Sequence, residues 1–249
     1  MNIEEYPSRA PEGYKKKESK LIMDEIAREL ADLQHILYAE QKRSVLIVFQ
    51  GMDASGKDGA TRKVFRYCSP TGINAHPFKK PSELENRYDF LWRVHQVVPA
   101  KGMIQIFNRS HYEDVLIQRV HRWIDEDTVN RRFEAINAFE RNLIHDNNTH
   151  IFKFYLHLSK ERQREKLQER IDNPRKQWKH NPNDWKEHEK WETYMRCYQD
   201  VIDRSEIPWI VVPSDQRWYR DYFIAERLLR EFQGMALELP SFKTDGEKS

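Results

Sequence analysis

The sequence has 249 residues, enough for one large domain or two small ones, and its 42 Lys and Arg against 40 Asp and Glu leave a formal net charge of +2. An aromatic content of 12% excludes a disordered chain, and the longest apolar run, Val45–Phe49, is far too short to cross a bilayer. Cys68 and Cys197 lie far apart, which favours free thiols over a disulfide framework, and the first residues lack the pattern of a secretory signal. We therefore expect a globular cytoplasmic protein with no membrane span and no general affinity for nucleic acid.

Helical and strand patterns alternate along the chain. Apolar residues at helical spacing predict a helix over 21–38, and the β-branched run Val45–Phe49 predicts a strand that is buried on both faces. A helix should follow over 57–67, and Ser82 with Glu85 has the spacing of a capping box that begins a helix reaching Val97. The further expected elements are a strand over 103–107, a helix from Ser110, a helix over 133–143, strands over 151–158 and 209–212, and a helix over 224–232.

Such alternation is typical of an α/β fold in which helices cover both faces of a parallel sheet. The stretch 170–185 interrupts the pattern, because it holds Pro174 and Pro182, two Trp, many basic residues and almost no aliphatic ones. We interpret it as a basic, lid-like excursion from a single domain that spans residues 1–249.

A glycine-rich loop follows the first strand. The segment Gly51-Met-Asp-Ala-Ser-Gly-Lys57-Asp58 has the G-x-x-x-x-G-K spacing of a P-loop between a strand and a helix. In a P-loop, backbone N–H groups converge on phosphate oxygens and the lysine reaches the outer phosphates. The alternative is an ordinary strand-to-helix turn with a solvated lysine. The phosphate-binding candidates in this loop are Gly51, Ala54, Ser55, Gly56, Lys57, Asp58 and Gly59.

The loop departs from the usual P-loop in its acidic residues. Asp58 stands where a Ser or Thr normally supplies a hydroxyl to magnesium, and Asp53 lies inside the loop. Because a carboxylate beside bound phosphate would repel it, Asp53 indicates a bridging magnesium ion. The alternative is a loop aspartate that faces solvent.

Polar residues follow the strand over 103–107. Asn108 offers a neutral oxygen where P-loop enzymes often place a metal-binding aspartate, and Arg109 has the planar fork that suits phosphate. Glu113 supplies a carboxylate, although it has the spacing to close a capping box on Ser110. Metal binding and helix capping are both open for Glu113, and the two roles are compatible.

These residues carry a resemblance to a known family. Three segments resemble the polyphosphate kinase 2 family. They are Gly-Met-Asp-Ala-Ser-Gly-Lys-Asp-Gly, Phe-Asn-Arg-Ser-His-Tyr-Glu-Asp-Val-Leu and, over 170–179, Arg-Ile-Asp-Asn-Pro-Arg-Lys-Gln-Trp-Lys. The resemblance runs from about residue 15 to 232 and implies a P-loop kinase-like fold. Asn108 with Glu113 is similar to class III of that family, which is associated with phosphorylation of nucleoside mono- and diphosphates.

The resemblance implies direct, in-line and reversible transfer of a terminal phosphoryl group between inorganic polyphosphate and nucleotides. The expected nucleotides are AMP, ADP and ATP, with guanine nucleotides as further candidates, and the expected assembly is a homo-oligomer, a tetramer or a dimer. Mg²⁺, with Mn²⁺ as a substitute, would be held by Asp53, Asn108 and Glu113. Lys57, Arg109 and Arg170 would spread the charge of the transferred group, so the catalytic candidates are Asp53, Lys57, Arg109, Glu113 and Arg170.

A polyanion needs a local basic groove, and the remaining basic candidates follow the same segments. Arg119 and Arg122 are expected on one face of the helix from Ser110, and Lys79 with Lys80 at an edge of the sheet. The candidates in the lid, besides Arg170, are Arg175, Lys176 and Lys179. For each of these residues taken alone, the alternative is a solvated surface charge.

Two rival functions stay open. One is an ATP-dependent nucleoside monophosphate kinase of the same fold, and the other is a non-catalytic protein that binds polyanions. His111 is expected to be structural, with a phosphohistidine intermediate as its alternative. Nucleobase stacking is open for one of five aromatic residues, Phe78, Trp92, Trp123, Trp178 and Trp185.

Overall fold

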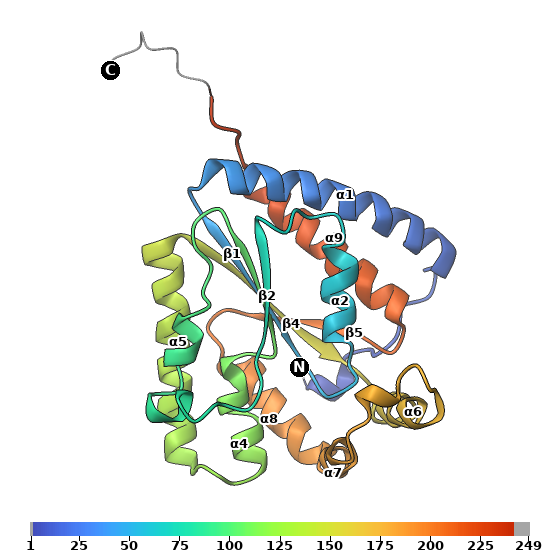
Figure 1. Cartoon of the computed structure of the whole chain (residues 1–249). Helices are drawn as coiled ribbons and strands as arrows, with labels where there is room; N and C mark the ends of the chain where they lie inside the picture. Colours follow the sequence, from blue (N-terminus) through green and yellow to red (C-terminus); the bar gives the residue numbers. More distant parts are fainter. Residues whose placement is uncertain (1, 242–249) are drawn as a thin grey trace.

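The computed structural model describes residues 2–241. Five parallel strands form one sheet in the order β2-β3-β1-β4-β5. The strands are β1 (Ser44–Gln50), β2 (Ile73–Pro77), β3 (Ile104–Asn108), β4 (Thr149–His157) and β5 (Trp209–Pro213). The central strand β1 is buried along its whole length, as its β-branched run predicts. Helices surround this sheet (Figure 1), which confirms the expected α/β fold.

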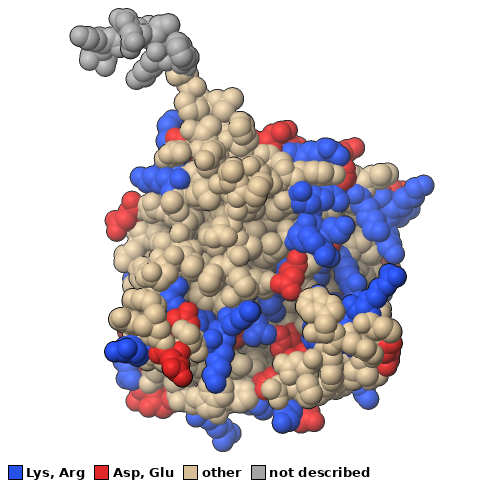
Figure 2. Space-filling model, in the orientation of Figure 1, with Lys and Arg blue, Asp and Glu red and all other residues tan. Residues whose placement is uncertain are grey.

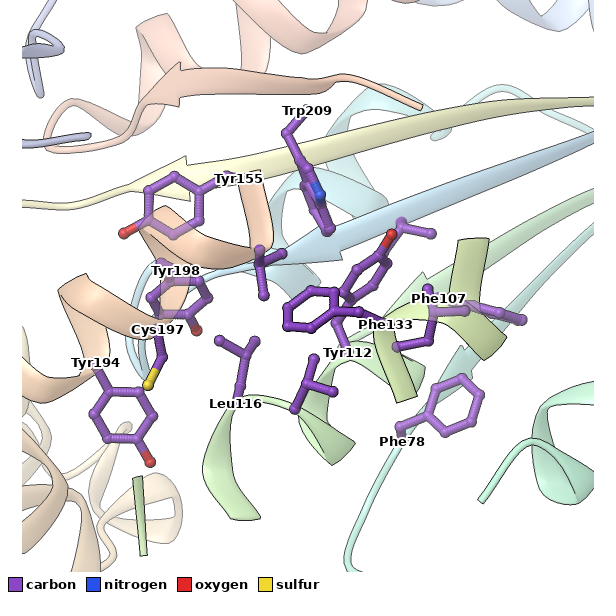
Figure 3. Close-up of a cluster of buried hydrophobic side chains, with 14 of the residues drawn as sticks. Phe78, Phe107, Tyr112, Leu116, Phe133, Tyr155, Tyr194, Cys197, Tyr198 and Trp209 are labelled. Carbon is purple, nitrogen blue, oxygen red and sulfur yellow. The ribbon is translucent and has the colours of Figure 1, made fainter. Parts of the chain in front are cut away.

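The sheet separates two apolar clusters. On one side, β1, β3 and β4 pack against α1 (Lys16–Glu40), α2 (Lys57–Val64) and α9 (Arg217–Gly234), and α1 lies along α9 (Figure 1). On the other side they pack against η3 (His111–Asp114), α5 (Glu126–Asn147) and α8 (Trp191–Arg204), with a core rich in aromatic side chains (Figure 3). The two faces of β1, β3 and β4 therefore contribute to different apolar clusters.

Short elements lie near the carboxyl ends of the strands. β4 leads into α6 (Lys160–Asp172), which is followed by η4 (Gln177–Lys179) and α7 (Asn183–Glu189) (Figure 1). The other short elements are η1 (Ile3–Glu5), η2 (Glu85–Arg87), α3 (Trp92–His95) and α4 (Ile117–Val120). Within residues 2–241, no helix is both long and apolar enough to span a membrane.

Two of the expected helices are wrong. Ser82 and Glu85 do exchange capping-box hydrogen bonds, but only the 3₁₀ turn η2 follows, because Tyr88 is extended and separates it from α3. The segment after Ser110 is also divided, into η3 and α4. The edge strand β2 escaped prediction, since its sequence Ile-Asn-Ala-His-Pro is half exposed and has no apolar run. Cys197 is buried and Cys68 half-buried, and both are free thiols.

Candidate phosphate site

The loop between β1 and α2 adopts the curled backbone that a phosphate cradle needs. Gly51, Ala54 and Gly56 have positive φ angles of 149°, 66° and 101°. A Cβ on Gly51 would lie 2.8 Å from the carbonyl oxygen of Leu156, so this close approach to β4 requires glycine. Gly56 precedes the first turn of α2, whose free N–H groups and dipole favour an anion.

Arg220 on α9 supports this loop through a hydrogen bond to its backbone, and no sequence motif indicates this residue. Its Nη1 donates to the carbonyl oxygen of Ser55 at 3.0 Å, while Nε and Nη2 donate to Asp221 Oδ1. A Cβ on Gly56 would lie 1.8 Å from Nη1, and one on Gly59 would lie 3.1 Å from Nη2. Position 56 therefore needs glycine, because a buried arginine from α9 fills the space behind the loop, and at Gly59 on α2 the same arginine leaves little room for a side chain.

Lys57 lies in the concave side of the loop. Its Nζ donates to the carbonyl oxygens of Gly51 at 2.7 Å and Met52 at 3.3 Å. Burial, together with the neighbouring Arg109, lowers the pKa of this ammonium to about 8 against the opposing effect of Asp53. An anion that bound here would stabilise the protonated form.

Asp53 and Arg109 form an ion pair across the carboxyl ends of β1 and β3. These strands are neighbours in register, with Phe49 opposite Asn108, so residues that follow them meet at one edge of the sheet. Arg109 has a positive φ of 61°, which turns the chain sharply after β3. Burial alone would raise the pKa of Asp53, but Arg109 and Lys57 outweigh it and hold that pKa below its usual value.

Glu113 does not close the capping box that its spacing suggests. Ser110 Oγ accepts from the backbone N–H of Tyr112, and the Glu113 carboxylate accepts instead from Gln50 Nε2 at 2.6 Å. Gln50 is fully buried at the end of β1, and its Oε1 accepts from Ser110 Oγ at 3.2 Å. With this contact in place, the carboxylate of Glu113 shares a pocket with Asp53 of the P-loop and with Arg109, which follows β3.

Asp53, Arg109 and Glu113 line a narrow pocket of about 30 Å³ with Gly51 and Met52. The pocket is also lined by four residues that no sequence motif indicated, namely Ile117, Glu187, Tyr194 and Tyr198. Tyr194 and Tyr198 come from α8 and are seen together in Figure 3. Nothing in their spacing distinguishes them from ordinary core residues of an amphipathic helix.

The donor set in this pocket fits a magnesium ion. Mg²⁺ prefers oxygen ligands and binds through one or two carboxylates together with substrate phosphates. The carboxylates of Asp53 and Glu113 both line the pocket. The amide of Asn108 donates to Asp58, so these two residues form a pair beside the carboxylates. Within residues 2–241, no three acidic, histidine or cysteine side chains gather as a preformed metal site.

The segment after β4 contacts the loop through α6, which is bonded in turn to α7. Gln163 on α6 donates from Nε2 to the carbonyl oxygen of Asp53 at 3.0 Å, and its Oε1 lies 2.7 Å from His188 Nδ1 on α7. Arg170 forms an ion pair with Asp184, and its charge helps to lower the pKa of Asp53. Arg170 therefore lies close enough to the loop to interact with it electrostatically.

The other basic candidates are placed differently. Arg119 and Arg122 do not share a helix face, because α4 ends at Val120 and Arg122 has a positive φ of 56°. Arg119 is instead paired with Glu126 and Asp200. Lys79 and Lys80 are exposed and follow β2, whose last residue, Pro77, lies opposite Asn108. In the segment 170–185, Lys176 pairs with Glu169, whereas Arg175 and Lys179 are exposed.

Two further expectations concern His111 and the aromatic residues. His111 is fully buried with Nε2 3.2 Å from Glu140 Oε1, which supports a structural role and leaves it out of reach of a phosphoryl group. Phe78 is buried against Phe107 and has no free face for a nucleobase, so the expectation that it could stack on a base is wrong. Trp178 is 78% exposed and Trp123 is 65% exposed.

Comparisons with known proteins agree with the motifs. The sequence pattern of the family described as polyphosphate kinase 2 matches residues 13–240. The chain is 43% identical over 224 residues to an AMP/ADP-polyphosphate phosphotransferase of Meiothermus ruber, which covers 89% of this chain and 84% of that relative. It is 35% identical over 257 residues to an ADP-polyphosphate phosphotransferase of Rhodopseudomonas palustris, which covers 96% and 88%.

The fold also matches a solved structure. The crystal structure of polyphosphate kinase 2 from Arthrobacter aurescens TC1 superposes with a TM-score of 0.94 at 36% identity, over 98% of this chain and 89% of that one. The resemblance inferred from the three sequence segments is therefore confirmed.

Proposed function

This chain belongs to the polyphosphate kinase 2 family, and we propose that it transfers the terminal phosphoryl group of inorganic polyphosphate to nucleoside mono- and diphosphates, reversibly and with Mg²⁺. The observation that carries the proposal is the meeting of Lys57, Asp53, Arg109 and Glu113 at one edge of the sheet. One relative is named an AMP/ADP-polyphosphate phosphotransferase and another an ADP-polyphosphate phosphotransferase, which supports both classes of acceptor.

The geometry favours direct transfer between the two substrates. Phosphoryl transfer depends on positioning and on neutralising charge more than on a covalent partner. The P-loop N–H groups would hold the transferred group at the start of α2, with the ammonium of Lys57 and the guanidinium of Arg109 against its oxygens. Asp53 and Glu113 would hold Mg²⁺, which supplies further neutralisation of the phosphate oxygens.

The surface around this site suits a long polyanion. In Figure 2, Lys and Arg gather over α2 and its surroundings, where Arg62 and Lys63 are exposed, although the net charge is only +2. Arg170, Arg175 and Lys179 would add to this surface if residues 170–185 close over bound phosphate as a lid.

The proposal also includes Mn²⁺ as a substitute metal, guanine nucleotides as acceptors, a homo-oligomeric assembly and a cytoplasmic location.

One experiment tests the proposed function. Purified protein with Mg²⁺ and polyphosphate is mixed with AMP, ADP, GMP or GDP, and the products are separated. We expect ADP and ATP from AMP, and ATP from ADP. Formation of ADP from ATP and AMP, with no product from polyphosphate, would instead support a nucleoside monophosphate kinase. No Mg²⁺-dependent turnover with either donor would support a non-catalytic polyanion-binding protein.

The depressed pKa of Lys57 predicts an alkaline limit to activity. The protonated ammonium binds phosphate and is lost as pH rises through about 8 in the free enzyme. Because kcat/KM reports groups in the free enzyme, we expect it to fall above pH 8 with a slope of about tenfold per pH unit. Bound phosphate stabilises the ammonium, so kcat should fall at a higher pH. Measurement of both parameters between pH 6.5 and about 10 checks this. In the variant Lys57→Arg, kcat/KM should no longer fall above pH 8. If kcat/KM still falls in this variant, the titrating group is not Lys57.

Substitution of Glu113 separates charge from hydrogen bonding. The variant Glu113→Gln keeps a side-chain oxygen near Gln50 but removes the charge, and Glu113→Ala removes both. If the carboxylate helps to hold Mg²⁺, both variants should need more Mg²⁺ for half-maximal rate and should lose AMP phosphorylation more than ADP phosphorylation. Titration of initial rates with Mg²⁺ at saturating acceptor measures this.

The control for Glu113 is Gln50→Leu, which removes its hydrogen-bond donor and leaves its charge in place. We expect Gln50→Leu to raise the Mg²⁺ requirement less than Glu113→Gln does. Full AMP phosphorylation by Glu113→Gln at unchanged Mg²⁺ would show that the charge of Glu113 has no part in the reaction.

A further inference from the structure

A buried ion pair lies in the core between the sheet and helices α5 and α8. Lys153 Nζ on β4 lies 2.7 Å from Glu140 Oε2 on α5, and both side chains are almost completely buried. Lys153 occupies a strand position whose neighbours on the same face, Ile151 and Tyr155, belong to the apolar core. Buried ion pairs of this kind often contribute no more stability than apolar residues of similar size. Stability alone therefore gives no reason for a lysine here.

The pair is bonded to the turn that follows β3. Tyr112 OH donates to Glu140 Oε1 at 3.0 Å and accepts from Lys153 Nζ at 2.6 Å. His111 Nε2 lies 3.2 Å from the same Oε1. Burial lowers the pKa of His111, and although burial would raise that of Glu140, Lys153 and His111 hold it below its usual value. The neutral imidazole therefore donates from Nε2 to an ionised carboxylate.

A third contact joins this network to β5. Tyr112 OH lies 3.1 Å from Ser205 Oγ, which accepts from Trp209 Nε1 at 2.9 Å. The rings of Tyr112 and Trp209 meet edge to face at 4.9 Å, among the aromatic side chains in Figure 3. The turn η3 is thus held by β4, α5 and the start of β5, three elements that are separate along the chain.

We propose that Lys153 and Glu140 are positioning residues, which hold His111 and Tyr112 so that Arg109 and Glu113 face the P-loop. His111 and Tyr112 lie between these two site residues in the sequence, and neither they nor the ion pair line the pocket. This inference rests on the proposed function of the site. Its physical basis is that a displacement of about 1 Å in a catalytic group can reduce the rate about 100-fold.

The test removes both charges together, so that no unpaired charge stays buried. We expect the double variant Lys153→Met/Glu140→Leu, which also removes the acceptor of Tyr112 and His111, to fold and to lose about 10- to 100-fold in kcat, with little change in the KM for ADP. Its Mg²⁺ requirement should rise, because Glu113 is less well placed. Amide hydrogen exchange over residues 109–113 should accelerate, and this readout is independent of catalysis. Tyr112→Phe, which removes only a hydroxyl, should show the same changes to a smaller extent and carries the test if the double variant does not fold.

The matched control is Leu228→Ala, which opens a cavity in the apolar cluster on the other side of the sheet. We expect it to lower the melting temperature and to leave kcat and the Mg²⁺ requirement unchanged. A double variant with normal kcat, Mg²⁺ requirement and exchange would overturn the proposal, as would an equal loss of kcat in Leu228→Ala at equal destabilisation. Absence of polyphosphate-dependent turnover in the wild type would refute the proposed function, and hydrogen exchange would still decide whether the network holds residues 109–113.

Discussion

Replacement of Lys57 by methionine should lower kcat for transfer from polyphosphate to ADP by about 100- to 1000-fold, the range measured when one preorganised donor is removed. The ammonium lies inside the loop, bonded to the carbonyl oxygens of Gly51 and Met52, where it would contact the outer phosphates. Methionine matches the length of the side chain and removes only the charge and the donors. Steady-state kinetics and a thermal melt on the same preparation measure the two effects.

The matched control is Lys101→Met, which changes an exposed lysine in the turn before β3, at the end of the strands away from the site. It should retain the kcat of the wild type. The melting temperature of Lys57→Met should stay near that of the wild type, because removal of a buried charge offsets the lost hydrogen bonds. Wild-type activity in Lys57→Met would refute its role, and a parallel loss of stability and activity would make the role structural.

The second large effect is expected from Asp53→Asn, which keeps the size of the side chain and removes its charge. We expect kcat to fall by about 100-fold or more and the Mg²⁺ requirement to rise. The competing explanation is that Asp53 serves only to hold Arg109, with which it forms an ion pair. Rate measurements at a series of Mg²⁺ concentrations, with polyphosphate and ADP saturating, give both quantities.

A double-mutant cycle with Arg109→Met separates these explanations. If Asp53 holds Mg²⁺, then Asp53→Asn should raise the Mg²⁺ requirement whether or not Arg109 is present. If Asp53 acts only through Arg109, then Asp53→Asn should have no further effect in the Arg109→Met background. The second pattern would remove Asp53 from the proposed metal ligands.

The sequence by itself determined the parts of this protein that depend on consecutive residues. The β-branched run Val45–Phe49 predicted a fully buried strand, and the glycines after it allow the left-handed backbone of a P-loop. Because β1 and β3 are parallel, their carboxyl ends share one edge of the sheet, which brings Asp53 and Arg109 together. The shared edge follows from the strand patterns and a general rule about parallel sheets, whereas the structure shows that β1 and β3 are neighbours in the sheet.

The tertiary structure decided the contacts between segments that are distant in the chain. Arg220 donates a hydrogen bond to Ser55, which lies 165 positions away in the chain. The carboxylate of Glu113 accepts from Gln50, whereas the local capping pattern predicts a hydrogen bond to the backbone of Ser110. The pairing of Arg119 with Asp200 likewise depends on how α4 packs against α8. The spacing of residues within a segment indicates its preferred backbone conformation and which of its faces is buried. It does not indicate which partner a polar side chain contacts, because that depends on how the helices pack around the sheet.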